Sequence, residues 1–202
     1  MRDTKERILA ASLALFARDG DEAVSVSDIA GALGMTKAAL YKHFRNKRDI
    51  FESILRRMER RDAEQAAEQA LPEGTAEEMA EAYGEATADR IVDFAKAMFR
   101  YWTEDGFAAQ FRRMLTLEQF RDPEMGRLYQ QYLVSGPLGY VADLFSAMGL
   151  PDPRGEAARL YSPLFLLYSV YDGAEDKAAV TALLDGLLEA ERTHLNECRK
   201  EG

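Results

Sequence analysis

The stretch SVSDIAGALGMTKAALYKHFRNKRDIF, residues 25–51, decides the fold of the first part of the chain. Ser25 is followed three residues later by Asp28, which is the pattern of a capping box, so a helix is expected to begin directly after Ser25. Gly34 then supplies a tight turn, and Thr36 is a good N-cap for a second helix. Two short helices joined by a glycine turn predict a helix-turn-helix.

The second of these helices is predicted to have two different faces. Leu40 and Phe44 are four residues apart and form the apolar face. The other face would present Lys37, Ala38, Tyr41, Lys42 and His43. In a helix-turn-helix the second helix can lie in a DNA major groove, where small side chains permit close approach and lysines and hydroxyls contact phosphates. This face is therefore a candidate DNA-reading surface. Asn46 with Asp49 predicts a further capping box, which opens a longer helix over about 47–70.

Positive charge is concentrated near the start of an otherwise acidic chain. Residues 25–51 contain six Lys, Arg or His, although the whole 202-residue chain has a net charge of -9. Residues 1–61 carry 13 Lys and Arg against 9 Asp and Glu, whereas the rest carries 13 against 26. A basic head on an acidic body indicates a polyanionic partner for the head alone. The alternative is a chance asymmetry of charge.

The remainder of the chain shows helical periodicity and no convincing strand pattern. One apolar stripe runs from Ile91 to Trp102, and breaks are expected at 71–75, 135–139 and 149–155. Residues 157–171 are apolar on nearly every side, so they are expected to be buried. We therefore predict an all-α fold, with a three-helix helix-turn-helix head joined to a larger C-terminal helical bundle. The predicted domains are 1–48 for DNA binding and 49–202 for ligand binding and dimerisation.

At this point the residues closely resemble the DNA-binding signature of TetR-family transcriptional regulators. The likeness lies in "DIA", the glycine of the turn, "ALYKHF" and the lysine after Asn46, and Phe16 and Gly20 fit the same domain. It covers roughly residues 4–51. The resemblance implies a homodimer that binds a palindromic double-stranded DNA operator, usually as a repressor. It also implies release from the operator when a small molecule enters the second domain.

The resemblance also implies which residues contact DNA. These are Ser25, Thr36, Lys37, Ala38, Tyr41, Lys42, His43 and Lys47. Ser25 and Val26 stand where relatives often place threonines that contact phosphate, and valine lacks a side-chain donor. Ala38 stands where many relatives have glycine, and it suits contact with a thymine methyl group. The alternative for Lys42 and His43 is an ordinary solvated helix face, and Tyr41 is near enough to Leu40 to belong partly to the core.

Two further sets of residues are predicted in the C-terminal part. The candidate ligand-binding residues are Phe94, Met98, Trp102, Phe111, Met114, Tyr132, Phe165 and Tyr168, and they suit an apolar or aromatic effector. The alternative for each of them is plain core. The candidate dimer interface, from two apolar helices near the end, is Leu160, Tyr161, Leu164, Val180, Leu183, Leu184 and Leu187. The alternative is burial within one subunit.

Other classes of protein find little support in the sequence. No Walker-A string, G-x-S-x-G or H-E-x-x-H is present, so no enzyme is predicted. His43, His194 and Cys198 lack any usual ligand spacing, and no metal or cofactor is predicted. No apolar run reaches a membrane span, and with a single cysteine we expect a cytoplasmic protein without a membrane partner. The alternative function is a helical regulator or scaffold controlled by a protein partner, with no small-molecule pocket.

Overall fold

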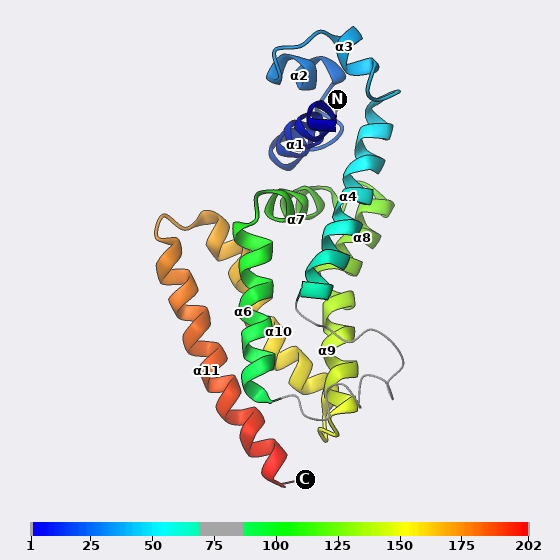
Figure 1. The fold of residues 1–202 in the computed structure, drawn as a ribbon. Coiled ribbons are helices and arrows are strands. Elements are labelled where there is room, and N and C mark those ends of the chain that lie inside the picture. The colour runs from blue at the N-terminus through cyan, green and yellow to red at the C-terminus, as the bar shows by residue number, and fades with distance from the viewer. Residues whose placement is uncertain (1, 69–86, 202) are drawn as a thin grey trace. The chain divides into compact units, whose positions relative to one another are not determined.

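The computed structural model describes residues 2–68 and 87–201, and within these ranges the chain is helical and forms no strand (Figure 1). The predicted all-α fold is thus confirmed. None of the helices in these ranges combines the length and the hydropathy needed to cross a membrane. The chain forms two compact units, and each is discontinuous in sequence because residues 106–129 belong with the N-terminal residues up to 68. The functional division at residue 48 stays a prediction.

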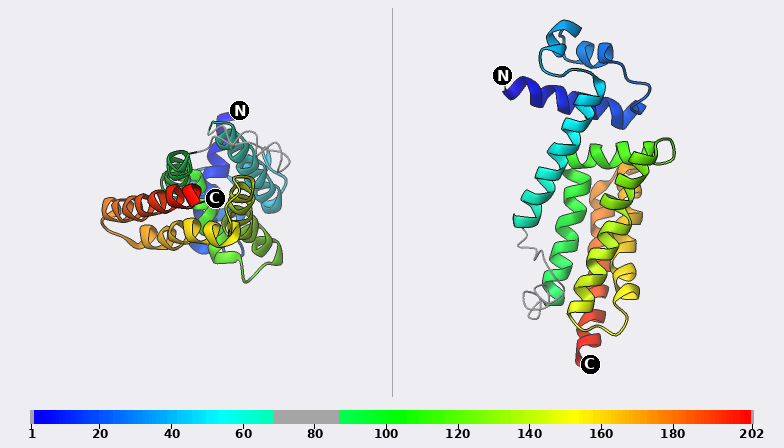
Figure 2. Two further views of the ribbon diagram at one scale, coloured as in Figure 1. Left: turned by 90° about the horizontal axis from the view of Figure 1, so that it is seen from below. Right: turned by 90° about the vertical axis from the view of Figure 1, so that its right-hand side faces the viewer.

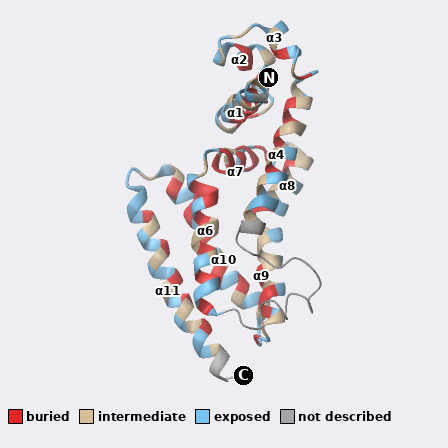
Figure 3. Ribbon diagram, viewed as in Figure 1, coloured by how far each residue is buried: buried red, intermediate tan, exposed pale blue. Residues whose placement is uncertain are grey.

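The first unit contains the N-terminal helices and one helix from the middle of the chain. Its helices are α1 (Arg2–Asp19), α2 (Val26–Ala32), α3 (Lys37–Tyr41), α4 (Lys47–Glu68) and α7 (Gly106–Glu118). Helix α8 (Pro123–Leu133) begins in this unit, and its last residues belong to the other. Helix α1 packs against α2, α4 and most extensively α7. Figure 3 marks the buried positions, of which Phe16, Ile29, Leu40 and Ile54 are fully buried.

The turn after α1 depends on a glycine and a buried carboxylate. Gly20 has φ = +87°, a left-handed conformation that favours glycine. A Cβ atom at Gly20 would also collide with Oε1 of Glu118, which is 2% exposed. This Oε1 accepts a hydrogen bond of 3.2 Å from the backbone N–H of Asp21. The end of α1 is therefore fixed against α7.

The second unit is a bundle of longer helices. It comprises α6 (Ala88–Glu104), α9 (Ser135–Ala147), α10 (Pro153–Gly173) and α11 (Lys177–Glu201), together with the end of α8. Helix α10 packs against α6, α9 and α11, and α11 packs against α6, so these helices run side by side (Figures 1 and 2). In the core, the ring of Phe99 stacks on Tyr168 at 5.6 Å between centroids and meets Tyr171 edge to face at 5.8 Å. These aromatic contacts join α6 to α10.

Most predicted breaks are observed, but one prediction about burial is wrong. Helix α8 ends at Leu133 and α9 begins at Ser135, so the helix is split at Val134, directly before the predicted break at 135–139, and residues 135–139 themselves are helical. Helix α10 begins at Pro153, within the predicted 149–155 loop. The predicted break at 71–75 lies outside the described residues. Residues 157–171 are not buried on every side, because Phe165, Leu166 and Val170 are 40%, 65% and 43% exposed. One face of α10 meets its neighbours in the bundle, and the opposite apolar face is exposed among residues 2–68 and 87–201.

Candidate nucleic-acid interface

The helix-turn-helix is held by the predicted caps. The backbone N–H and the hydroxyl of Ser25 both donate to Asp28 Oδ2, at 2.8 and 2.6 Å, and the Asp28 N–H donates to Ser25 Oγ at 3.3 Å. The Ser25 hydroxyl, followed by its N–H, holds the pKa of the Asp28 carboxyl below its usual value. Gly34 has φ = +63°, as a tight turn between α2 and α3 requires. The capping box and the glycine turn are therefore confirmed.

Helix α3 is anchored on one side and exposed on the other. Thr36 Oγ1 accepts a 3.2 Å hydrogen bond from the Ala39 N–H, which caps the helix. Leu40 is fully buried and Phe44 is 4% exposed, so the apolar face points into the unit. The opposite face exposes Lys37, Ala38, Tyr41 and Lys42, while His43, just after the helix, is half-buried. Tyr41 is 50% exposed, so it is not a core residue.

The start of α4 differs in detail from the predicted capping box. Asn46 Oδ1 accepts the Asp49 N–H at 2.8 Å, as expected. The Asp49 carboxylate, however, accepts the N–H of Arg45 at 2.9 Å rather than that of Asn46. The bond from the Arg45 N–H, assisted by the Arg45 guanidinium, lowers the pKa of Asp49. The Asp49 side chain thus fixes the backbone at Arg45, one residue before the predicted partner Asn46.

Two cations at the start of α4 are engaged inside the first unit. Lys47 Nζ donates to the backbone oxygen of Asp21 at 2.6 Å and lies 3.4 Å from Asp21 Oδ2. Nη2 of Arg48 donates to both carboxylate oxygens of Glu124, at 2.9 and 2.8 Å, and this pairing raises the pKa of Arg48. Lys47 therefore ties α4 to the loop after α1. Its contact with DNA stays a prediction, and its ammonium is less exposed to a ligand than those of Lys37 and Lys42.

The residues predicted to line a ligand site are divided between the two units. Phe111 and Met114 lie fully buried in α7 of the first unit. The second unit holds Phe94, Met98, Trp102, Tyr132, Phe165 and Tyr168. Trp102 and Tyr132 meet edge to face at 6.3 Å, and Phe94 leans against Tyr140 at 6.4 Å. Phe165 is exposed, so it does not line an interior space of the single chain.

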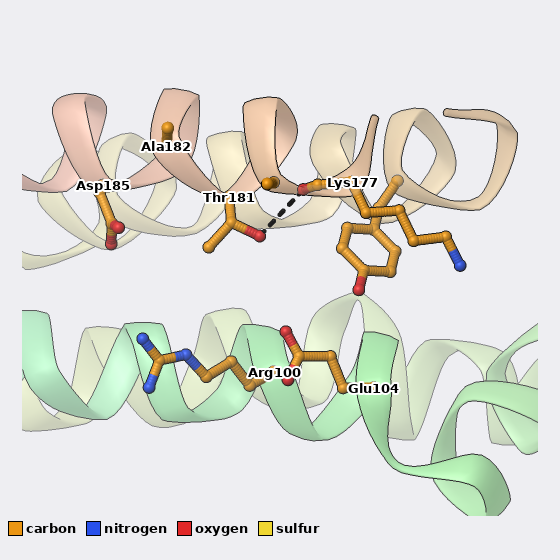
Figure 4. Close-up of a pocket in the computed structure, with 8 residues that line it drawn as sticks. Arg100, Glu104, Lys177, Thr181, Ala182 and Asp185 are labelled. Carbon is orange, nitrogen blue, oxygen red and sulfur yellow. Dashed lines mark hydrogen bonds between the residues drawn. The ribbon is translucent and has the colours of Figure 1, made fainter. Parts of the chain in front are cut away.

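A groove lined by several charged residues lies between α6 and α11 (Figure 4), and Tyr171 of α10 is part of its lining. Its volume is about 480 Å³, and its lining is Arg100, Glu104, Tyr171, Lys177, Ala178, Thr181, Ala182 and Asp185. Burial, followed by the negative charges of Glu104 and Asp172, raises the pKa of Tyr171. None of these lining residues was predicted. Arg100 and Glu104 share one face of α6 at a spacing of four, but the sequence does not show which helix faces them.

The predicted dimer residues fall into two groups. Leu160, Leu164, Val180 and Leu184 are buried within the single chain, and their part in a dimer interface stays a prediction. Tyr161 is half-buried, and its hydroxyl donates to the backbone oxygen of Leu133 at 2.8 Å. The exposed large apolar residues of these helices are Phe165, Leu166, Val170, Leu183 and Leu187, which we name the α10–α11 face. Leu183 and Leu187 thus stay candidates.

The comparisons with known proteins agree with this arrangement. Residues 8–54 match the family "Bacterial regulatory proteins, tetR family". Over 53 residues the chain is 40% identical to the HTH-type transcriptional regulator AcrR of Shigella flexneri, a match that covers 26% of this chain and 25% of AcrR. The match thus spans about a quarter of the length of that relative.

Solved structures resemble nearly the whole chain in fold. The fatty acid degradation regulator FadR from Bacillus halodurans has a TM-score of 0.61 at 17% identity, covering 93% of this chain and 94% of that one. A transcriptional regulator from Saccharomonospora viridis, solved in complex with choline, has a TM-score of 0.59 at 21% identity, covering 98% and 95%. Residues 8–54 thus carry a helix-turn-helix that matches the tetR family of bacterial regulatory proteins, and nearly the whole chain shares its fold with solved structures of transcriptional regulators.

Proposed function

We propose that the protein is a transcriptional regulator that binds a double-stranded DNA operator as a homodimer and responds to a small molecule. The observation that carries the proposal is the exposed face of α3, whose lysines stand opposite the buried Leu40. A helix held in this way presents side chains to a major groove while its apolar face keeps it on the domain. The net positive charge of residues 1–61 favours a polyanion at the same end of the chain.

The residues of α3 divide into two roles in this proposal. Lys37 and Ala38, in the first turn, would meet base edges, where lysine pairs with guanine and a methyl group packs on thymine. Tyr41 and Lys42, further along the exposed face, donate to phosphate oxygens. Ser25 is a weaker candidate, because its single hydroxyl proton already goes to Asp28. A phosphate at Ser25 would also face the Asp28 carboxylate.

The homodimer in this proposal forms through the α10–α11 face. Five large apolar side chains on two adjacent helices, each between 40% and 65% exposed, are unusual on a monomer surface. Two copies related by a two-fold axis would bring four helices together and cover these side chains in both protomers. A dimer presents two copies of α3, which is the requirement for reading a palindromic operator.

The effector in this proposal is a small apolar or aromatic molecule that binds in the second unit. The protein without effector acts as a repressor on the operator, and binding of the effector releases it from the DNA. The aromatic side chains around Trp102 and Tyr132 support this class of ligand. These rings now pack on one another, so a ligand would have to separate them and favour one of two conformations. If no small molecule changes operator affinity, control by a protein partner is the alternative.

The experiment that tests the proposal is a titration of the protein against duplexes from the DNA flanking its own gene, at two salt concentrations. We expect selective binding of two protomers that weakens steeply with salt. Lys42→Ala should lower the dependence of log K on log salt by about one unit for each protomer that loses a phosphate contact. Arg154→Ala, an exposed cation in α10, is the matched control and should leave the slope unchanged. Weak binding that is equal on all duplexes, including a library of random sequences, would contradict the proposal.

A further inference from the structure

Three side chains with metal-binding chemistry meet between α10 and α11. Glu156 lies in the first turn of α10, and His194 and Cys198 lie four residues apart in α11. His194 Nε2 is 2.8 Å from Glu156 Oε2 and 3.4 Å from Cys198 Sγ, whereas His194 Nδ1 is 3.9 Å from the sulfur. The potential ligand atoms all lie within 4.8 Å of one another, and all three residues are half-buried. One ring nitrogen therefore faces both a carboxylate and a thiol.

We propose that Glu156, His194 and Cys198 form a binding site for a divalent transition-metal ion of the Zn²⁺ type. A carboxylate, an imidazole and a thiolate are the three ligand types that proteins use for zinc. This mixed set suits Zn²⁺ or Co²⁺ better than Mg²⁺ or Ca²⁺, which prefer oxygen ligands alone. Neither the family match nor the DNA-binding proposal requires such a site. A test that refutes the metal site therefore leaves the DNA-binding proposal unchanged, and the reverse also holds.

The distances are close to those of a metal-bound cluster. With zinc bonds of about 2.0–2.1 Å to nitrogen and oxygen and about 2.3 Å to sulfur, tetrahedral ligand atoms lie about 3.4 Å (N and O) and about 3.6 Å (N and S) apart. The observed Nε2–Sγ distance of 3.4 Å already fits this arrangement. The Nε2–Oε2 distance of 2.8 Å is that of a hydrogen bond, and it needs to open by about 0.6 Å when the metal replaces the proton.

The surroundings of the cluster are compatible with a bound cation. The nearby guanidinium of Arg159 donates to Glu191 Oε2 at 2.7 Å, so Arg159 is already paired with an acid other than Glu156. The negative charges of Glu191, Glu156 and Cys198 contribute to the raised pKa of Arg159. A thiol binds a metal ion as its thiolate, so metal binding would release the thiol proton to solvent.

A metal ion held in this way would have two structural effects. It would join the first turn of α10 to the last part of α11, helices that also carry the α10–α11 face. Three protein ligands converge among the residues that the structure describes, so a fourth coordination position would be left for water or another donor, as in catalytic zinc sites. The site would therefore make the stability of this helix pair depend on metal availability.

Co²⁺ is the probe for the first test, with the reduced, chelator-treated full chain prepared without a histidine tag. We expect a thiolate-to-cobalt charge-transfer band and the strong visible bands of a tetrahedral site, and Zn²⁺ should displace both. Cys198→Ser should abolish the charge-transfer band. His194→Asn and Glu156→Gln should weaken Zn²⁺ binding at least as much as the roughly 10- to 100-fold loss known for outer-shell partners. Glu197→Gln, an exposed acid on the same helix, is the matched control and should bind normally.

A second measurement uses only the wild-type protein, so it tests the proposal even if a variant folds poorly. Cys198 is the only cysteine of the chain, so the alkylation rate of the wild-type protein reports on this one thiol. Stoichiometric Zn²⁺ should slow alkylation at least tenfold, and excess chelator should restore the original rate. The proposal is overturned if wild-type protein gives no charge-transfer band, or if Zn²⁺ leaves the alkylation rate unchanged. A band that persists in Cys198→Ser would overturn it as well.

Discussion

Two adjacent leucines of α11, Leu183 and Leu184, should respond in opposite ways to substitution. Leu183 belongs to the α10–α11 face and is 53% exposed, whereas Leu184 is 1% exposed inside the chain. We expect Leu183→Glu to leave each protomer folded and to dissociate the proposed homodimer. We expect Leu184→Ala to create a cavity and to lower the free energy of unfolding by about 2–5 kcal/mol. Substitution of Leu183 is therefore expected to affect dimerisation, whereas substitution of the adjacent Leu184 is expected to affect folding stability.

The size of the Leu183 effect follows from its exposed half. Complete burial of a leucine side chain is worth about 1.5–3 kcal/mol, so covering the exposed half contributes about 1 kcal/mol. Two-fold symmetry removes this contribution twice, or about 2 kcal/mol, which corresponds to a roughly 30-fold higher dimer dissociation constant. The two glutamates that would enter an apolar interface weaken it further, because a carboxylate without a partner resists burial.

Sedimentation equilibrium over a range of protein concentrations measures this dissociation constant, and circular dichroism verifies the fold of each variant. The matched control is Leu117→Glu, because Leu117 is a leucine of α7 with 43% exposure that lies outside the α10–α11 face. It should associate like the wild-type protein. If Leu183→Glu remains dimeric with an unchanged dissociation constant, the α10–α11 face is not the interface and the reasoning from exposure fails.

Three further changes test the first unit. Gly20→Ala should lower the free energy of unfolding by at least about 1–2 kcal/mol in urea denaturation, because φ of +87° is strained for alanine and the methyl group meets Glu118; an unchanged midpoint would contradict this. Lys37→Ala, if Lys37 reads a base, should cost about 1–3 kcal/mol of operator affinity at one base position only, and an equal loss on all sequences would refute that role. The pKa of Asp28 is lowered by Ser25, so the stabilisation by this carboxylate is complete above its ordinary pKa of 3.8 and is lost as the pH falls through the lower, folded-state value. Thermal melts in acid should therefore show a steeper loss for the wild-type protein than for Asp28→Asn.

The head was well predicted because its signals are local. The Ser25 capping box, the Thr36 cap and the positive φ of Gly34 each depend on residues within four positions of one another. Helical spacing likewise placed Leu40 inside and Lys37 outside. Local hydrogen bonding and a period of 3.6 residues are properties that a sequence shows directly.

The contacts that the sequence did not reveal join residues far apart in the chain. Lys47 was expected at DNA, but its ammonium bonds the backbone of Asp21, which no spacing rule pairs with it. Large apolar residues follow one another in α10 over residues 164–168, and the leucines of α11 come in adjacent pairs at 183–184 and 187–188, so periodicity did not identify which leucines meet neighbouring helices. His194 and Cys198 are four residues apart, but the sequence analysis did not recognise them as a ligand pair, and Glu156, 38 residues from His194, joins them only in the fold.

The discontinuity of the first unit bears on how the chain folds during synthesis. Helix α1 packs more extensively against α7 than against α2 or α4, and the backbone of Asp21 bonds Glu118, 97 residues later. A nascent chain of 68 residues therefore contains the complete helix-turn-helix but lacks the helix that covers much of α1. The first unit is completed only when α7 has been synthesised, and α7 follows α6 of the second unit in the chain, so completion of the first unit depends on synthesis of part of the other. A truncated product that ends before residue 106 would leave the apolar side of α1 uncovered, and it would be prone to aggregation and degradation rather than able to occupy the operator.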